Sequence, residues 1–176
     1  MAGDVPSTIH CPPSTRTNLE AKMTGILQIL FLIAAVAGSG YFGMWARRYD
    51  ISGVEMWFPL GLLVSYAINP FAGLVVGAAI ITITWALHPY GLHHLAISTA
   101  SFGGTFYLAA YFFPIAQQNF LFQTMLVAAI FQIISNAFYI LTKYPLSRIA
   151  RFVIVNLFLC WLIFSRIGFI LVQWLK

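Results

Sequence analysis

Long runs of uncharged, apolar residues fill most of the chain from residue 23 onward, and short polar or proline-containing breaks separate them. The runs cover residues 23–45, 56–87, 92–113, 120–141 and 149–174. About 20 consecutive apolar residues are enough for a helix to cross the roughly 30 Å hydrocarbon core of a bilayer. The pattern therefore predicts an all-α, polytopic membrane helix bundle.

The run over residues 56–87 is too long for one membrane crossing. As a single helix it would extend about 48 Å, well beyond the hydrocarbon core. Pro70 disfavours helical geometry at the preceding Asn69, so two short helices joined by a tight turn are expected. The prediction is six transmembrane segments with a short central hairpin, or five segments if this region crosses the membrane only once.

Residues 1–22 differ from the rest of the chain because they are rich in Pro, Ser and Thr and lack apolar periodicity. Such a composition is typical of a disordered tail, or of an extended tail that lies on a neighbouring surface. Thr17 and Glu20 have the spacing of a helix-capping pair. We expect two regions, a polar tail over residues 1–22 and a transmembrane helical domain over residues 23–176.

The charge content supports a bilayer environment. Apolar residues make up 61% of the chain and charged residues 7%, whereas soluble domains are about 25% charged. The net charge of +5 comes from basic residues beside the apolar runs, where they set topology or contact anionic lipid. Nucleic acid is therefore not an expected partner.

The basic residues do not fix the orientation of the chain. With six segments, one side of the membrane carries Arg47, Arg48, Lys143, Arg148 and Arg151, and the opposite side carries Arg16, Lys22 and Lys176. With five segments the tail joins the more basic side, which is normally cytoplasmic. Both orientations stay open.

Small residues recur at a spacing of four in two of the predicted helices, which allows another helix backbone to approach closely. The positions are Ala34, Ala35, Gly38 and Ser39 in the first helix and Gly73 and Gly77 in the hairpin. They predict either a docking face for a partner protein or packing against helices of the same chain.

Arg166 is an ionisable side chain inside the last apolar run, where charges are costly and usually functional. No carboxylate lies within an apolar run, so its partner would be Asp50, Glu55, a backbone carbonyl, a lipid phosphate or another subunit. Alternatively, the long side chain snorkels to the membrane interface. Asn136 and Asn156, in the last two runs, can pair across helices as structural contacts.

Recognisable catalytic and metal-binding sets are missing from the sequence. His88, His93 and His94 are spaced by five and one residues, whereas a helical metal pair needs a spacing of three or four. The acidic residues all lie in the tail or the first loop, so chemistry inside the membrane lacks its usual acid–base and metal-binding groups. We therefore expect no enzyme activity, no metal site and no cofactor.

Three stretches of the sequence resemble the MreD family of rod-shape-determining membrane proteins. They are Phe58-Pro59-Leu60-Gly61-Leu62, Gly73-Leu74-Val75-Val76-Gly77-Ala78 and His88-Pro89-Tyr90-Gly91-Leu92-His93-His94-Leu95-Ala96-Ile97-Ser98. That family has a proline-led segment, a G-x-x-x-G hairpin helix, a turn, and a helix that opens with Leu-Ala. Many members carry an acidic residue after the second glycine, where this chain has Ile80, Ile81 and Thr82. The chain is also similar to the substrate-binding S-components of energy-coupling-factor vitamin transporters.

The two resemblances imply different functions. Similarity to MreD implies a non-catalytic scaffold in cell-shape or cell-wall assembly, which holds a bitopic MreC-like protein at the inner membrane. Similarity to S-components implies a subunit that binds a vitamin-sized ligand and docks on an energising module through its first helix. We expect the scaffold, in the inner or plasma membrane, with lipid and other membrane subunits as partners. An S-component-like uptake subunit and an accessory subunit of a larger membrane complex are the alternatives.

Overall fold

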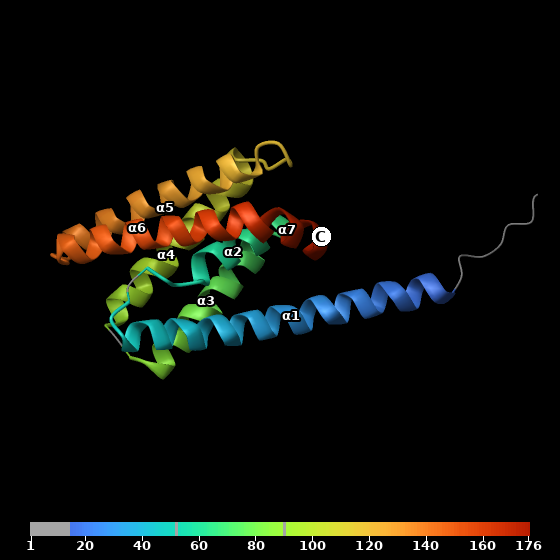
Figure 1. The fold of residues 1–176 in the computed structure, drawn as a ribbon, viewed down its shortest axis with the longest axis horizontal. Helices are drawn as coiled ribbons and strands as arrows, with labels where there is room; N and C mark the ends of the chain where they lie inside the picture. Colours follow the sequence, from blue (N-terminus) through green and yellow to red (C-terminus); the bar gives the residue numbers. More distant parts are fainter. Residues whose placement is uncertain (1–14, 52, 90) are drawn as a thin grey trace, which may run out of the picture. The chain divides into compact units, whose positions relative to one another are not determined.

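The computed structural model describes residues 15–51, 53–89 and 91–176, and the regular structure in these ranges is helical (Figure 1). Its elements are α1 (Thr15–Arg48), α2 (Trp57–Ala67), α3 (Pro70–Leu87), α4 (Leu92–Phe112), α5 (Phe120–Leu141), α6 (Leu146–Ile163), the π-helical turn η1 (Phe164–Gly168) and α7 (Phe169–Leu175).

Four helical stretches in the described ranges are long and apolar enough to cross a membrane. They are Thr24–Arg48, Pro70–Leu87, Phe120–Leu141 and Leu146–Leu175. The expectation of an all-α chain with membrane-type helices is thus confirmed, whereas the number of crossings stays a prediction.

The chain divides into two compact units, Met1–Ala34 and Ala35–Lys176, here called unit 1 and unit 2. In unit 1, helix α1 begins at Thr15 and therefore includes residues 15–22, which the sequence pattern assigned to the polar tail. No proline or glycine interrupts the chain between Pro13 and Gly25, and the Leu, Ala and Lys residues in that interval favour helix. Residues 1–14 of the expected tail lie outside the described residues.

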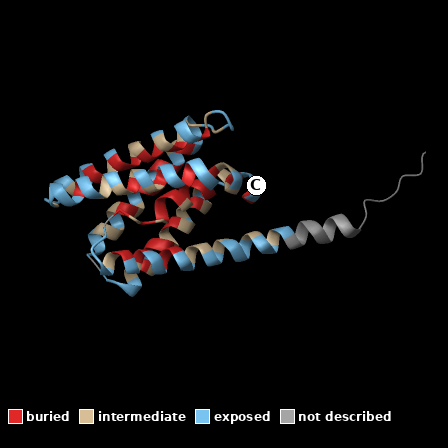
Figure 2. Ribbon diagram, viewed as in Figure 1, coloured by how far each residue is buried: buried red, intermediate tan, exposed pale blue. Residues whose placement is uncertain are grey.

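An aromatic cluster forms the core of unit 2. Its members are Trp57 and Phe58 of α2, Phe102 and Phe106 of α4, and Phe131 of α5, and all five are buried. Phe58 stacks on Phe131 with ring centroids 4.2 Å apart, and the Trp57 ring lies 5.3 Å from that of Phe102. Figure 2 shows buried residues on the inward faces of the helices around α2. Because stacked and edge-to-face rings add to the gain from apolar burial, the cluster holds α2, α4 and α5 together.

Helix α2 is short and enclosed by its neighbours. Eight of its 11 residues are buried, which is typical of a helix that is apolar all round. Its length corresponds to about 16 Å, roughly half of the hydrocarbon core. Near its end, the Tyr66 hydroxyl donates to the carbonyl of Phe113 at 3.0 Å. The end of α2 therefore lies beside the end of α4.

The break in the central hairpin is confirmed at the predicted residues. Asn69 caps α3, because its side-chain oxygen accepts a hydrogen bond from the Ala72 amide at 2.8 Å and Pro70 occupies the first turn. These are the usual roles of Asn and Pro at a helix start. The two helices approach so closely that a Cβ atom on Gly61 would lie 3.0 Å from the Gly73 carbonyl oxygen.

The last predicted span, residues 149–174, is one continuous helical stretch from Leu146 to Leu175 that contains η1. The sequence pattern did not predict this π-helical turn. Gly168 closes it and packs tightly on the bundle, since a Cβ atom there would lie 2.9 Å from the ring of Phe120 and 3.4 Å from Leu63. The widened turn therefore coincides with a close contact to α5 and α2.

Replacing Gly73 with alanine tests the close approach in the hairpin. The new Cβ atom would overlap the Gly61 carbonyl oxygen and lie 2.7 Å from the Ser65 Cβ atom, so one helix would have to move. We expect Gly73→Ala to lower the free energy of unfolding by about 1–3 kcal/mol, measured by unfolding in detergent. The control is Gly104→Ala in α4, where nothing lies within 4 Å of the new atom. Equal stabilities of the two variants would contradict the close approach.

Candidate functional site

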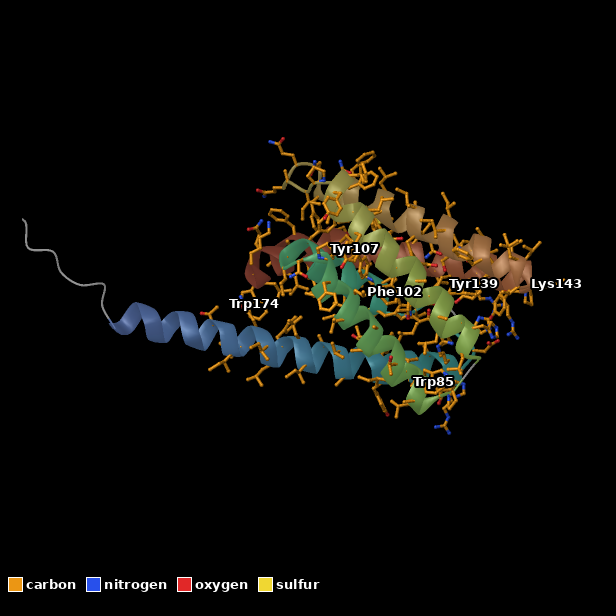
Figure 3. All side chains as sticks on the ribbon, turned by 180° about the vertical axis from the view of Figure 1, so that it is seen from behind. Trp85, Phe102, Tyr107, Tyr139, Lys143 and Trp174 are labelled. Carbon is orange, nitrogen blue, oxygen red and sulfur yellow. The ribbon has the colours of Figure 1, made fainter. Side chains whose placement is uncertain are left out.

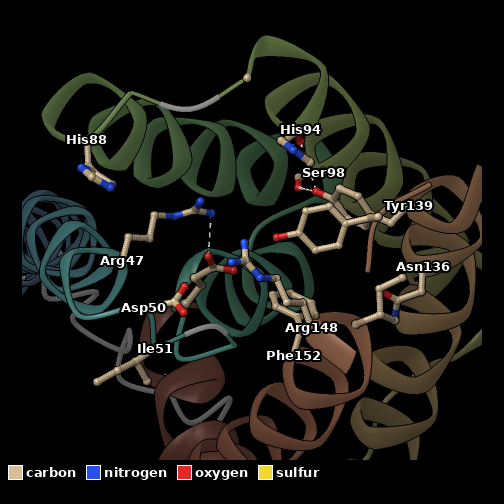
Figure 4. Close-up of a pocket in the computed structure, with 14 residues that line it drawn as sticks. Arg47, Asp50, Ile51, His88, His94, Ser98, Asn136, Tyr139, Arg148 and Phe152 are labelled. Carbon is tan, nitrogen blue, oxygen red and sulfur yellow. Dashed lines mark hydrogen bonds and ion pairs between the residues drawn. The ribbon is translucent and has the colours of Figure 1, made fainter. Parts of the chain in front are cut away.

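Five helix ends of unit 2 meet around a polar pocket with a volume of about 340 Å³ (Figure 4). They are the C-terminal ends of α1, α3 and α5 and the N-terminal ends of α4 and α6. The polar lining side chains are Arg47, Asp50, Glu55, His88, His94, Ser98, Asn136, Tyr139, Tyr144 and Arg148. Figure 3 shows Tyr139 and Lys143 toward this end of unit 2 and Trp174 toward the opposite end.

The segment between α1 and α2 runs into the bundle. The sequence pattern predicts a short polar break here, yet Gly53 and Glu55 are both buried. The Glu55 carboxylate accepts a hydrogen bond from the Arg47 guanidinium at 2.6 Å, within an ion pair. A buried carboxylate needs such a partner because desolvation penalises the isolated charge. The pair therefore fixes the end of α1 to the chain that enters α2.

Gly53 allows this segment to lie directly on α6. Its φ angle of +93° is in the region that favours glycine. A Cβ atom there would come within 2.8 Å of the Phe152 carbonyl oxygen and 2.9 Å of the Val155 Cβ atom. The Asn156 side chain donates to the Gly53 carbonyl at 3.3 Å. Residue 53 thus requires both a positive φ angle and the absence of a side chain.

A buried amide network continues from Asn156 into α5. The Gln132 amide donates to the Asn156 side-chain oxygen at 2.6 Å, and the Asn136 amide donates to the Gln132 side-chain oxygen at 3.1 Å. The expected direct pair of Asn136 and Asn156 is not among the hydrogen bonds of the described residues, and Gln132 connects the two side chains instead. Gln132 was not among the predicted residues, although its spacing of four from Asn136 inside an apolar run was an available signal.

Aromatic and hydroxyl groups line the side of the pocket formed by α4 and α5. The hydroxyls of Ser98 and Tyr139 are hydrogen-bonded at 2.9 Å, and the Tyr139 hydroxyl also donates to the His94 carbonyl at 3.4 Å. The His94 ring lies 5.3 Å from the rings of both Tyr139 and Tyr144, and 4.0 Å from that of His93. Ser98, His94, Tyr139 and Tyr144 together form this side of the pocket, here called the aromatic wall. It presents ring faces and edges as well as hydrogen-bonding groups.

Of the three histidines, His94 belongs to this wall through its contacts with Tyr139 and Tyr144. Within the described ranges, no group of three or more His, Cys, Asp or Glu side chains is close enough to hold a metal ion. His88 and His94 line the pocket from the end of α3 and the start of α4. Their position makes them candidates for hydrogen bonding to a bound molecule.

The small residues singled out in the sequence fall into two groups. Gly73 and Gly77 are buried, and a Cβ atom on Gly77 would lie 3.0 Å from the ring of Phe102. Their close contacts are therefore with helices of the same chain. Ala34 and Gly38 are exposed, Ala35 is half-buried and Ser39 is buried. A Cβ atom on Gly38 would meet nothing within 4 Å.

Two other glycines of α1, which the sequence analysis did not select, make the close contacts inside unit 2. A Cβ atom on Gly40 would lie 2.5 Å from an Ile83 methyl carbon, and one on Gly43 would lie 2.7 Å from the Thr84 hydroxyl. The Thr84 hydroxyl also donates to the Gly40 carbonyl at 3.2 Å. The face with Gly40 and Gly43 thus packs on α3, which leaves Gly38 on another face.

Arg166 lies apart from the pocket. It is exposed in η1, and no hydrogen bond or ion pair connects its side chain to another residue in the described part of the chain. Asp50 and Glu55, its two candidate partners in the sequence, both line the pocket, and Glu55 pairs with Arg47.

Comparison of the chain with protein-family models, with curated proteins and with solved structures finds no match. The similarity to MreD proteins and S-components therefore stays an expectation from the sequence. The function of the pocket has to be argued from its own residues.

Replacing Asn156 with leucine tests whether the amide network holds the 53–56 segment in place. The change removes the donor to Gly53 and the acceptor for Gln132, and buried groups without partners cost about 1–3 kcal/mol each. We expect a lower free energy of unfolding and faster hydrogen exchange at the amides of Val54 and Glu55. The control is Gln173→Leu, at an exposed position of the same helical stretch. Unchanged exchange in Asn156→Leu would rule out the anchoring role.

Proposed function

We propose that this chain is an integral membrane subunit that binds a small molecule in the polar pocket. One observation carries the proposal, namely the convergence of ten polar side chains from five helix ends and the segments next to them around a cavity of about 340 Å³. This volume is within the range of about 300–1,000 Å³ that is usual for small-molecule sites. The pocket is therefore large enough for a vitamin-sized compound.

The charges around the pocket suit a ligand with an acidic group. Arg47 is paired with Glu55, whereas the Arg148 side chain makes no hydrogen bond or ion pair in the described part of the chain and points into the pocket (Figure 4). A guanidinium can bind a carboxylate or phosphate through two hydrogen bonds. Asp50 also lines the pocket and would accept from a donor group on the same ligand.

The aromatic wall suits a ligand that contains a ring. Tyr139, Tyr144 and His94 present faces and edges, and Phe152 and Ile149 supply apolar contacts. Aromatic groups favour offset and edge-to-face contacts with another ring. We therefore expect a planar, ring-containing molecule with an acidic group, which agrees with the vitamin-type ligands that the resemblance to S-components implies.

The basic residues around the pocket indicate from which side of the membrane a ligand would enter. In the six-crossing arrangement, Arg47, Arg48, Lys143, Arg148 and Arg151 share the pocket side of the inner or plasma membrane. The positive-inside rule makes such a side cytoplasmic, whereas S-component uptake needs a pocket that opens outward. The proposal is therefore ligand binding, and it does not include uptake.

A thermal-shift screen of the purified protein in detergent tests the binding proposal. The panel consists of water-soluble vitamins and related ring-containing carboxylic acids and phosphates. A ligand present at 100 times its Kd stabilises the native state by about 2.7 kcal/mol, so a true ligand should raise the melting temperature by several degrees. Arg148→Met and Tyr139→Phe should reduce this shift.

Arg151→Met is the matched control for Arg148→Met. Both arginines are exposed near the start of α6, but Arg151 does not line the pocket, so its loss should leave the shift intact. The proposal would be contradicted if no compound in the panel raised the melting temperature. It would also be contradicted if both pocket variants kept the full shift produced by a compound that binds the wild type.

A second candidate function is partner docking through α1, as in the expected scaffold or an accessory subunit. The observation that favours it is the open surface at the exposed Gly38, where an added Cβ atom would meet nothing within 4 Å. A small residue at such a position allows a second helix to approach closely in a membrane. A bitopic MreC-like protein or an energising module would use the same face, and neither interferes with ligand binding in the pocket.

Replacing Gly38 with leucine tests the docking face. The side chain enters open space in the described structure, so the bundle should keep its stability while a partner helix is pushed away. We expect at least one protein that copurifies with the gently solubilised wild type to be lost, as measured by quantitative mass spectrometry. Gly104→Leu, at another exposed glycine with open surroundings, is the control. An unchanged set of copurifying proteins would contradict the docking role.

A further inference from the structure

Arg166 is placed near the middle of an otherwise uncharged helical surface. From Phe152 to Leu175 it is the one charged residue in the sequence, and at 1.5 Å per residue this stretch is roughly 36 Å long. Arg166 lies about 4 Å from the midpoint of the stretch, on its C-terminal side. The exposed guanidinium thus belongs to the central part of the outer surface of α6, η1 and α7.

Snorkelling does not bring this side chain to the interface of a bilayer that is centred on the Phe152–Leu175 stretch. In that placement, the nearer edge of the hydrocarbon core is roughly 11 Å from Arg166 along the helix axis. That distance exceeds the reach of an extended arginine side chain. In addition, the Cα–Cβ bond of a helical residue tilts toward the helix N-terminus, which for Arg166 means toward the bilayer centre.

Within unit 2, the described residues supply no carboxylate at this depth. Asp50 and Glu55 line the pocket together with Phe152, and Arg166 lies about 21 Å further along the helix than Phe152. A second copy of unit 2 in a parallel arrangement would bring the same two acids at the same end. The partner of Arg166 is therefore not one of the acids of unit 2.

The exposed surface around Arg166 is mostly apolar and carries a second polar side chain, as expected for a face that docks another membrane helix. Gln173 follows Arg166 by seven residues, which is two helical turns, and is exposed like Arg166. Ile170 lies between them and is 70% exposed. Arg166 is also part of η1, and π-helical turns inside α-helices occur frequently at functional sites.

We infer that the outer face of α6, η1 and α7 docks a transmembrane helix of another protein that carries an aspartate or glutamate near its centre. The Arg166 guanidinium would form an ion pair with that carboxylate, in a geometry that permits two parallel hydrogen bonds. Gln173 would bind a second polar side chain two turns along the partner helix. This contact is separate from the pocket and from the Gly38 face, and it does not depend on the proposed function.

Synthetic transmembrane peptides test the inference with the full chain in phosphatidylcholine vesicles. The peptides are Leu-Ala helices with flanking lysines and a single central Glu or Gln, and energy transfer between fluorescent labels reports binding. We expect the wild type to bind the Glu peptide about tenfold more tightly than the Gln peptide, as for polar contacts of 1–2 kcal/mol between membrane helices. Arg166→Leu should remove the preference, and Arg166→Gln is the second variant in case the first does not fold.

Arg151→Leu is the matched control, because Arg151 is exposed near the polar start of α6 and its loss should preserve the preference. Equal binding of the two peptides by the wild type would overturn the inference. Retention of the preference by a folded Arg166 variant would also overturn it. So would a result in which Arg166 affects only the retention of phosphatidylglycerol in native mass spectrometry, because the guanidinium would then bind lipid phosphate.

Discussion

Backbone polar groups inside a membrane bundle need hydrogen-bond partners, and the 53–56 segment has to meet this requirement without being helical. The side-chain amide of Asn156 donates to the Gly53 carbonyl, and the ion pair with Arg47 compensates the buried Glu55 carboxylate of the same segment. Non-helical backbone is tolerated in a membrane protein where protein or a polar cavity surrounds it. Here α6 lies on one side of the segment, and the pocket lies on another.

The pocket depends on this inward path. Because residues 53–56 occupy the pocket end, α2 starts only at Trp57, which packs on Phe102 in the aromatic cluster. Phe102 follows Ser98 by one turn of α4, so the aromatic core is adjacent to the polar residues that line the pocket. Asp50, Ile51 and Glu55 line the pocket, so the chain path that precedes α2 also forms part of the pocket.

Local signals predicted the helices, whereas the pocket depends on contacts between distant residues. Asn69 and Pro70 act on their own turn, so the hairpin break could be predicted, and the bounds of α5 agree with its apolar run. The contact between Asn156 and Gly53 joins residues 103 positions apart, and no local pattern encodes it. Glu55 resembled a surface acid because its burial depends on Arg47 and on the packing of Gly53 against α6.

Spacing alone also cannot say which face of a helix a small or charged residue occupies. Gly73 and Gly38 both belong to four-residue pairs, yet Gly73 contacts α2 and Gly38 faces outward. The charged residues Glu55 and Arg166 likewise have different surroundings that their sequence positions do not indicate. Glu55 is compensated within the chain, so its burial explains the fold and needs no further molecule. Arg166 has no such compensation within unit 2, and its place near the centre of an apolar surface is the basis for the proposed partner helix.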